Sequence, residues 1–186
     1  MNIRLRRFQG GTSLIEVLVS MIILSVGLLS LVVLHGRLHV MQVESYQRSQ
    51  ALVMLNDMAS RIALNRNDAG SYVTGSPLGV NMTCPTGTAT RQEADFSEWC
   101  AGLQGAAETT GGSQVGAMVG ARACVEDLGG GTYLLTVAWQ GFAPLSAPPA
   151  SVTCGSGLYD GTGDSPCVDD LCRRVVTTVL QIATLT

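Results

Sequence analysis

The amino-acid sequence predicts an α+β fold, in which a long N-terminal helix precedes a globular domain that contains β-strands. The helix is predicted by residues 14–34, which are uncharged apart from Glu16 and supply about the twenty apolar positions that a helix needs to cross a bilayer. The strands are predicted by residues 132–140, where apolar side chains alternate with others, as in a strand with one buried face. A chain of 186 residues is long enough for one anchor helix and one globular domain.

The segment that precedes the apolar run is basic. Residues 1–11 contain Arg4, Arg6 and Arg7, contain no acid, and end in two glycines. In an ordinary secretory signal the apolar region comes before a small-residue cleavage site, whereas here the small residues come first. Cleavage at this site would therefore remove a leader and leave the apolar helix on the mature chain.

The predicted helix continues well beyond the apolar run. No proline occurs before Pro77, and apolar side chains recur at spacings of three and four, as in a helix with one buried face. These positions are Leu52, Leu55, Ala59 and Ile62. A helix from residue 12 to about residue 65 would be about 80 Å long. We therefore expect a hydrophobic membrane or filament-core helix at 12–35 and an amphipathic continuation at 36–66.

These features resemble the type IV prepilin leader. In that family a prepilin peptidase cuts after the glycine, here Gly11, the new amine on Thr12 is methylated, and an acid occupies the fifth mature position, here Glu16. Thr12 departs from the common pattern, because many pilins have phenylalanine there. The chain is most similar to minor pilins of the PilV type. The resemblance is carried by residues 14–19, 27–29, 49–51 and 57–61, and by scattered later residues such as Asp95, Trp99 and Trp139.

The resemblance implies a fold, a location and a role. The helix would pack on a small antiparallel sheet in a periplasmic or extracellular domain at 67–186, and the chain would move from the bacterial inner membrane to a surface pilus. As a minor pilin it would initiate or cap pilus assembly and support twitching motility and adhesion. Its partners would be the prepilin peptidase, other minor pilins and the major pilin. Two alternatives stay open: a minor pseudopilin of a type II secretion system, and a tip adhesin.

Glu16 is a candidate functional residue. A carboxylate within a membrane helix is unfavourable by roughly a few kcal/mol and is usually retained where it has a partner. The resemblance suggests that this partner is the amine of Thr12 on a neighbouring subunit. The alternative is a carboxylate that extends into the lipid headgroups and has no role in assembly.

The charges and cysteines predict an exported domain. Three arginines precede the apolar run and none follows it until Arg37, which places the leader in the cytoplasm. All six cysteines follow the anchor, and an even number in an exported domain indicates disulfides. They are Cys84, Cys100, Cys124, Cys154, Cys167 and Cys172. Of fifteen possible pairings, we expect Cys84 with Cys100 first, then Cys154 with Cys167 or Cys172. Zinc is disfavoured because no histidine follows His39.

The globular domain is expected to begin with loops and end with strands. Residues 67–116 are rich in Gly, Ser, Thr and Asn, which predicts an irregular region. Strands are predicted at 118–126 and 132–140, on either side of a glycine-rich turn, and at 175–182.

Other functional classes receive little support. After loss of the leader, eight arginines face fourteen acids, which argues against a broad nucleic-acid surface. A local patch is the remaining alternative, but solvated surface side chains are expected at Arg91, Arg122, Arg173 and Arg174.

An acidic loop could hold calcium through Asp160, Asp164, Asp169 and Asp170. His35 and His39 are expected at the membrane exit. We find no catalytic motif and expect no enzyme activity, cofactor or metal.

Overall fold

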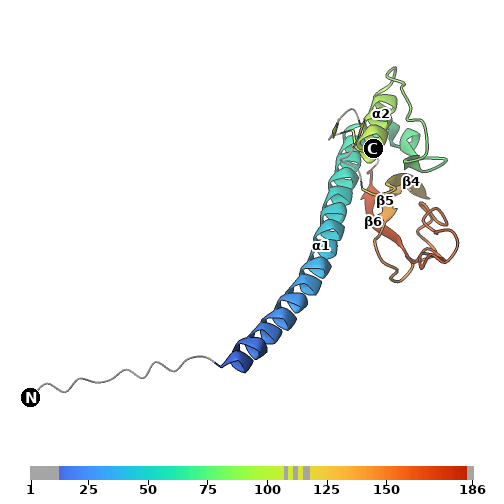
Figure 1. The fold of residues 1–186 in the computed structure, drawn as a ribbon. Helices are drawn as coiled ribbons and strands as arrows, with labels where there is room; N and C mark the ends of the chain where they lie inside the picture. The colour runs from blue at the N-terminus through green and yellow to red at the C-terminus, as the bar shows by residue number, and fades with distance from the viewer. Residues whose placement is uncertain (1–12, 107–108, 111–112, 115–117, 184–186) are drawn as a thin grey trace, which may run out of the picture. The chain divides into compact units, whose positions relative to one another are not determined.

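A computed structural model describes residues 13–106, 109–110, 113–114 and 118–183. The chain divides into two units, Met1–Gln42 and Val43–Thr186. The described part of the first unit is the beginning of helix α1, which runs from Leu14 to Leu64 (Figure 1). The predicted C-terminal end of the helix, at residue 65 or 66, is thus confirmed to within two residues, while its predicted start at Thr12 lies outside the described residues.

The second unit combines the end of α1 with a small antiparallel sheet, which confirms the α+β prediction (Figure 1). Its sheet has four strands in the order β1-β4-β5-β6, and β2 and β3 form a separate pair. In chain order the elements after α1 are η1 (Arg66–Tyr72), β1 (Leu78–Gly79), α2 (Arg91–Leu103), β2 (Thr109–Thr110), β3 (Ser113–Gln114), β4 (Arg122–Gly129), β5 (Thr132–Gln140) and β6 (Arg173–Gln181).

The core forms where one face of α1 meets α2 and the sheet. From α1, the buried side chains at intervals of three and four are Gln47, Ala51, Leu55, Met58 and Ile62. The same apolar cluster takes Trp99 and Leu103 from α2 and Leu135 and Val137 from β5. The predicted buried face of the helix was wrong at Leu52, which is 42% exposed. Leu52 follows the buried Ala51 by one residue and is therefore turned about 100° away from the buried face.

Helix α2 corrects the expectation that residues 67–116 are irregular. Its first turn carries a capping box: the hydroxyl of Thr90 accepts a bond from the backbone N–H of Glu93, and the Glu93 carboxylate accepts one from the N–H of Thr90. This arrangement satisfies two backbone donors that a helix start leaves free. The Thr-x-x-Glu signal was present in a segment whose composition otherwise favours loops.

The hairpin of β4 and β5 turns at the predicted glycines. Gly129, Gly130 and Gly131 all have positive φ angles of 62° to 86°, a conformation that glycine adopts without steric cost. β5 has its predicted bounds, and β6 begins and ends within two residues of the prediction. β4 starts four residues later than expected, because Gly120 has a φ of 64° and breaks the extended backbone before Arg122.

Candidate functional site

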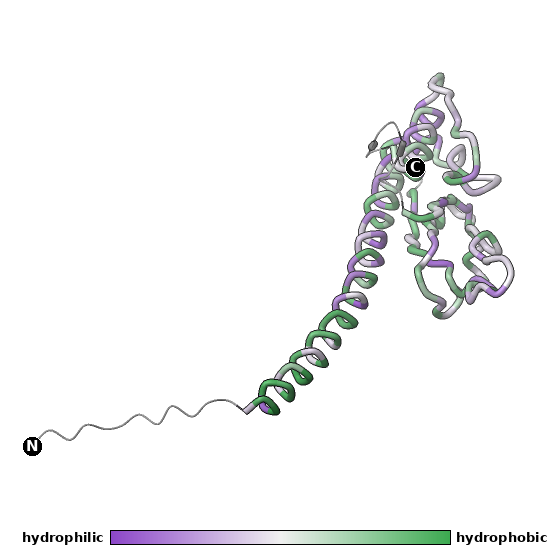
Figure 2. The backbone as a smooth tube through the Cα atoms, in the orientation of Figure 1, coloured by the Kyte–Doolittle hydropathy of each residue, from purple (hydrophilic) through white to green (hydrophobic). Residues whose placement is uncertain are grey.

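The first half of α1 presents apolar side chains on all sides. Between Leu14 and Leu34 the large apolar side chains are 43% to 78% exposed within the chain, and Figure 2 shows this part of the helix as hydrophobic along most of its length. In length and composition, α1 contains a segment that could cross a membrane. So much exposed apolar surface on one element needs a lipid bilayer or other apolar helices to cover it.

Glu16 lies in the first turn of this helix. The first backbone bonds of the helix run from the N–H groups of Glu16 and Val17 to the carbonyl of Ser13, at 2.9 and 3.3 Å. A carboxylate at this end of a helix is favoured by the helix dipole. Within the described residues the Glu16 carboxylate has no ion-pair partner. The predicted cleavage residues Gly11 and Thr12 lie outside the described residues.

Three serines in the apolar half of α1 donate their hydroxyl hydrogen bonds to the backbone of the same helix. The hydroxyls of Ser20, Ser25 and Ser30 donate to the carbonyls four residues earlier, at 2.7 to 3.0 Å. A hydroxyl without a partner is costly in an apolar surrounding. The helix can therefore keep these small polar residues where no water is present.

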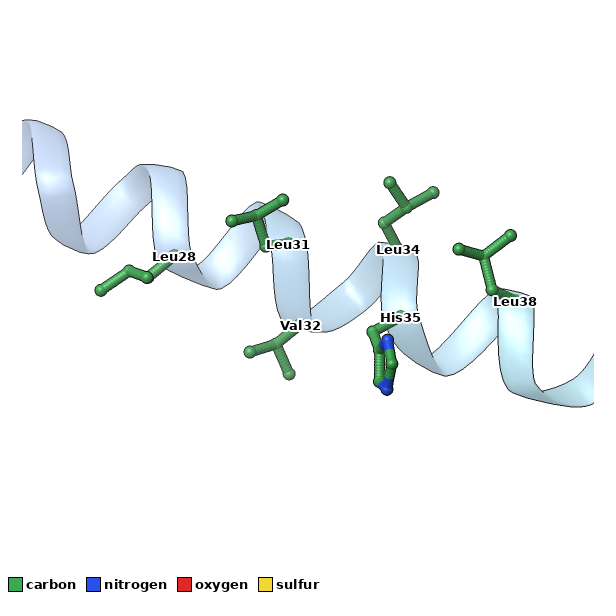
Figure 3. Close-up of a pocket in the computed structure, with 6 residues that line it drawn as sticks. All are labelled: Leu28, Leu31, Val32, Leu34, His35 and Leu38. Atoms are coloured by element: carbon green, nitrogen blue, oxygen red, sulfur yellow. The ribbon is translucent and has the colours of Figure 1, made fainter.

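A shallow hollow lies on the surface of this helix (Figure 3). All of its lining residues come from α1: Leu28, Leu31, Val32, Leu34, His35 and Leu38. Because one helix supplies every wall, the hollow is the open space between neighbouring side chains and does not enclose a ligand. No cluster of three or more metal-binding side chains occurs among the described residues, at His35 and His39 or elsewhere.

A buried carboxylate joins α1, η1 and α2 in the globular unit. Asp95 is 1% exposed and lies 2.8 Å from the guanidinium of Arg61 and 3.2 Å from that of Arg91. The hydroxyl of Tyr72 donates to the same carboxylate at 2.6 Å. This network was missed at the level of sequence. Its available signals were the acids Asp57 and Asp95, each spaced four residues from an arginine.

The network changes the titration of its members. Partial burial lowers the pKa of Arg61, but hydrogen bonds to Glu98, Asp95 and Asp57 outweigh this effect and raise the pKa above its ordinary value. Burial, together with the hydrogen bond to Asp95, raises the pKa of Tyr72 from 10.0 to about 12. Both shifts favour the charge state that the network uses: a cationic Arg61 and a neutral, donating Tyr72.

The expectation of solvated arginines is wrong for Arg122 and Arg173, which are buried, and wrong in part for Arg174, whose side chain is only 15% exposed. Arg173 is 3% exposed, and its guanidinium donates to the carbonyls of Val152 and Cys154. Arg122 is also buried, with its guanidinium carbon 5.1 Å from the centre of the Tyr159 ring. These arginines hold the long loop between β5 and β6 to the sheet, because that loop offers backbone carbonyls and an aromatic face.

The second half of α1 also holds this loop. Glu44 accepts a hydrogen bond from the backbone N–H of Phe142 at 3.1 Å, and lies 3.7 Å from the guanidinium of Arg174. Arg174 in turn donates to the carbonyls of Ala143 and Leu171. An acid on the helix thus fixes both ends of the loop.

The six cysteines form three disulfides. Cys84 pairs with Cys100, the pairing expected first. The second expectation is wrong, because Cys154 pairs with Cys124 of β4, while Cys167 pairs with Cys172. The loop after β5 folds back over the sheet and brings Cys154 to the strand, and this long-range return has no signal in cysteine spacing.

The acidic loop uses its carboxylates for internal bonds. Asp170 accepts from the hydroxyl of Ser156 and the N–H of Gly157, and lies 3.2 Å from Arg173. Asp160 accepts from the N–H of Asp170 at 2.8 Å. These contacts give two of the four acids of the calcium hypothesis a role in shaping the loop.

Comparison with known proteins identifies the N-terminal signal. Residues 6–32 match the family model of the prokaryotic N-terminal methylation motif. Comparison with curated proteins and with solved structures gives no match. The motif supports a protein of the type IV pilin or pseudopilin class, and it implies processing by a prepilin peptidase and an assembly context. Together with the apolar helix, it indicates membrane anchoring and pilus association.

Proposed function

We propose that this chain is a minor pilin of the PilV type, which joins other minor pilins in a complex that initiates or caps a type IV pilus. Through that role it supports pilus assembly, twitching motility and adhesion. The observation that carries the proposal is the single carboxylate of Glu16 in the otherwise uncharged run of residues 14–34, placed within the methylation motif. The role is structural, and it calls for no cofactor.

The proposed life history has two stages. Residues 1–11 are a leader that the peptidase removes after Gly11. Before assembly the mature chain is a single-pass inner-membrane protein with its disulfide-linked domain in the periplasm, since the arginines of the leader favour the cytoplasm. During assembly the apolar helix at 12–35 exchanges lipid for the helices of neighbouring subunits.

Glu16 is the residue that would set the position of the chain in that complex. An unpaired charge in an apolar surrounding costs roughly 3 to 5 kcal/mol, whereas a formed pair adds little net stability. A subunit at the wrong axial position is therefore destabilised by more free energy than a correctly placed subunit gains from its ion pair. We propose that the amine of Thr12 on a neighbouring subunit supplies the compensating charge.

Deletion of the gene with complementation tests the role and separates its alternatives. We expect the deletion strain to carry few or no surface pili while it still produces major pilin, and the intact gene to restore them. Normal pili with defective secretion through a type II system would instead favour a minor pseudopilin. Normal pili and secretion with lost attachment would favour a tip adhesin.

A further inference from the structure

The smallest of the three disulfides closes a ring around two residues with an unusual backbone. Cys167 and Cys172 are five positions apart, whereas the other bridges join residues 16 and 30 positions apart. Inside this ring Asp169 and Asp170 have φ angles of 51° and 61°. Residues with a Cβ atom rarely adopt this left-handed conformation, and they keep it only where the surrounding structure holds them. The ring therefore stores backbone strain.

Asp170 connects the ring to another part of the same loop. Its carboxylate accepts hydrogen bonds from the hydroxyl of Ser156 and the N–H of Gly157, at 2.9 and 2.8 Å. Its own N–H donates to the carboxylate of Asp160 at 2.8 Å. Because the backbone conformation of Asp170 directs both groups, the strained ring is coupled to residues 156–161.

The segment that follows Cys154 has fixed ends. Cys154 is bonded to Cys124 of β4, and Cys172 directly precedes β6, where its carbonyl accepts a 2.8 Å hydrogen bond from the N–H of Gly141. Residues 155–171, all of which the structure describes, contain no helix or strand. A rearrangement of the ring can therefore be confined to this segment. The short ring also contributes least to the stability of the fold, so the sheet should survive its opening.

The three disulfides differ in their access to solvent. Cys167 is half-buried, whereas Cys124 and Cys154 are both buried. The remaining bridge also has one half-buried member, Cys84, but that residue packs against the apolar core. Strained or exposed disulfides are more readily reduced than unstrained, buried ones. The Cys167 bridge combines strain with access.

We propose that the Cys167–Cys172 bridge is a redox-sensitive clasp, which a dithiol reductant opens to release residues 155–171 from their closed arrangement. With the bridge closed, the ring holds Asp169 and Asp170 in the left-handed conformation, and Asp170 holds residues 156–161. With the bridge open, both residues return to common backbone conformations and these bonds are lost. The clasp does not depend on Glu16 or on the leader, so its test stands apart from that of the proposed function.

The reduction proceeds by two thiol–disulfide exchanges. A thiolate of the dithiol attacks the Sγ atom of Cys167, the bond to Cys172 breaks, and the Cys172 sulfur leaves and takes up a proton. The second thiol of the reductant then attacks the reductant's own sulfur in the mixed disulfide, which releases Cys167 as a thiol and leaves the reductant as a disulfide. The dithiol thus supplies both electrons and both protons.

Stepwise reduction of the full chain in detergent tests the clasp. The chain is equilibrated with reduced and oxidised dithiothreitol in increasing ratio, free thiols are alkylated, and peptides are identified by mass spectrometry. We expect Cys167 and Cys172 to be labelled at a ratio about tenfold or more below that needed for the other four cysteines. At that ratio, amide hydrogen exchange should rise in residues 155–171 and stay unchanged in β4 and β5.

Substitution of Asp169 tests the role of strain. Asp169 is exposed, and glycine adopts a positive φ angle without steric cost. Asp169→Gly should therefore need about a threefold or higher dithiothreitol ratio for reduction of the ring. Asp164→Gly is the matched control, since Asp164 is exposed in the same segment but has no positive φ angle, and it should behave like the wild type.

A variant without the bridge tests the conformational step separately. Cys167→Ser combined with Cys172→Ser should show the faster exchange of residues 155–171 with no reductant present. The proposal would be overturned by earlier reduction of either other bridge, by unchanged exchange in the open form, or by equal reduction of Asp169→Gly and the wild type.

Discussion

The hydroxyl of Tyr72 donates a 2.6 Å hydrogen bond to the carboxylate of Asp95, and both side chains are buried. Asp95 belongs to α2 and also contacts Arg61 of α1 at 2.8 Å. One carboxylate therefore connects three consecutive helical elements. The part of α1 that belongs to the globular unit is therefore held there by polar contacts as well as by its apolar face.

Loss of this carboxylate charge should destabilise the globular unit. Asp95→Asn keeps the shape of the side chain but leaves Arg61 and Arg91 without their buried counter-charge. We expect the free energy of unfolding to fall by roughly 1 to 3 kcal/mol. Urea denaturation followed by the fluorescence of the buried Trp99 and Trp139 measures the change.

Glu98 provides the matched control for this substitution. It also contacts Arg61, at 2.6 Å, but its side chain is 64% exposed. Glu98→Gln should change the free energy of unfolding by less than about 1 kcal/mol, because exposed ion pairs contribute little. An equal loss in the two variants would show that burial of Asp95 is not what gives the network its strength.

The shifted pKa of Tyr72 predicts a loss of stability in alkali. The value rises from 10.0 in the unfolded chain to about 12 in the folded one, so the folded state holds its proton more tightly. The stabilisation is therefore complete below pH 10 and is lost as the pH rises through 12, by about 2 to 3 kcal/mol in total.

Tyr72→Phe should reduce this pH dependence. Unfolding free energies measured from pH 9 to pH 12 should fall less steeply in the variant than in the wild type. Some slope should remain, because burial also raises the pKa of Tyr159. Parallel curves for the two proteins would mean that Tyr72 titrates normally and that its bond to Asp95 is weak.

The three disulfides should contribute unequally to stability. They join residues 30, 16 and 5 positions apart, and chain-entropy estimates for such loops are about 3.7, 3.1 and 2.1 kcal/mol. Serine at Cys124 should therefore destabilise most and serine at Cys172 least. Thermal unfolding gives the order, and thiol titration of the native wild type should detect no free thiol. The reverse order, or six reactive thiols, would contradict the assignment.

Processing should depend on the absence of a side chain at the cleavage position. Gly11→Val introduces a branched side chain at the proposed cut, so the peptidase should leave the leader attached. Immunoblots of membranes should show a precursor longer by the eleven residues 1–11, while Gly10→Ala serves as a control for change elsewhere in the leader. A mature band of normal size from Gly11→Val would show that residues 1–11 are not a leader cleaved after Gly11.

Much of the fold could be predicted because it depends on local patterns. The long helix follows from an uncharged run and the absence of proline before Pro77, and the β4–β5 hairpin follows from alternation around three glycines. Helix α2 was missed because its composition is that of a loop, although the capping box at Thr90 was visible. The buried face of α1 was misjudged at Leu52, because exposed apolar residues on this helix blur the periodicity.

The long-range contacts could not be predicted in the same way. The pairing of Cys124 with Cys154 and the burial of Arg173 both depend on how the loop after β5 returns over the sheet. The partners of Asp95 come from segments that are more than twenty residues away, except for Arg91. Such contacts are set by tertiary packing, which overrides local preference.

The central claim is that Glu16 positions the chain in a pilus assembly complex, and Glu16→Ala tests it most directly. The variant should insert in the membrane and be processed like the wild type, because neither step uses the carboxylate. It should be depleted at least about tenfold from sheared pili and from complexes with other minor pilins, since the amine that pairs with Glu16 would lose its counter-charge. Glu16→Asp should recover part of the incorporation, and Ser20→Ala, one turn along the same helix, should leave it unchanged. Incorporation of processed Glu16→Ala at the wild-type level would contradict the claim.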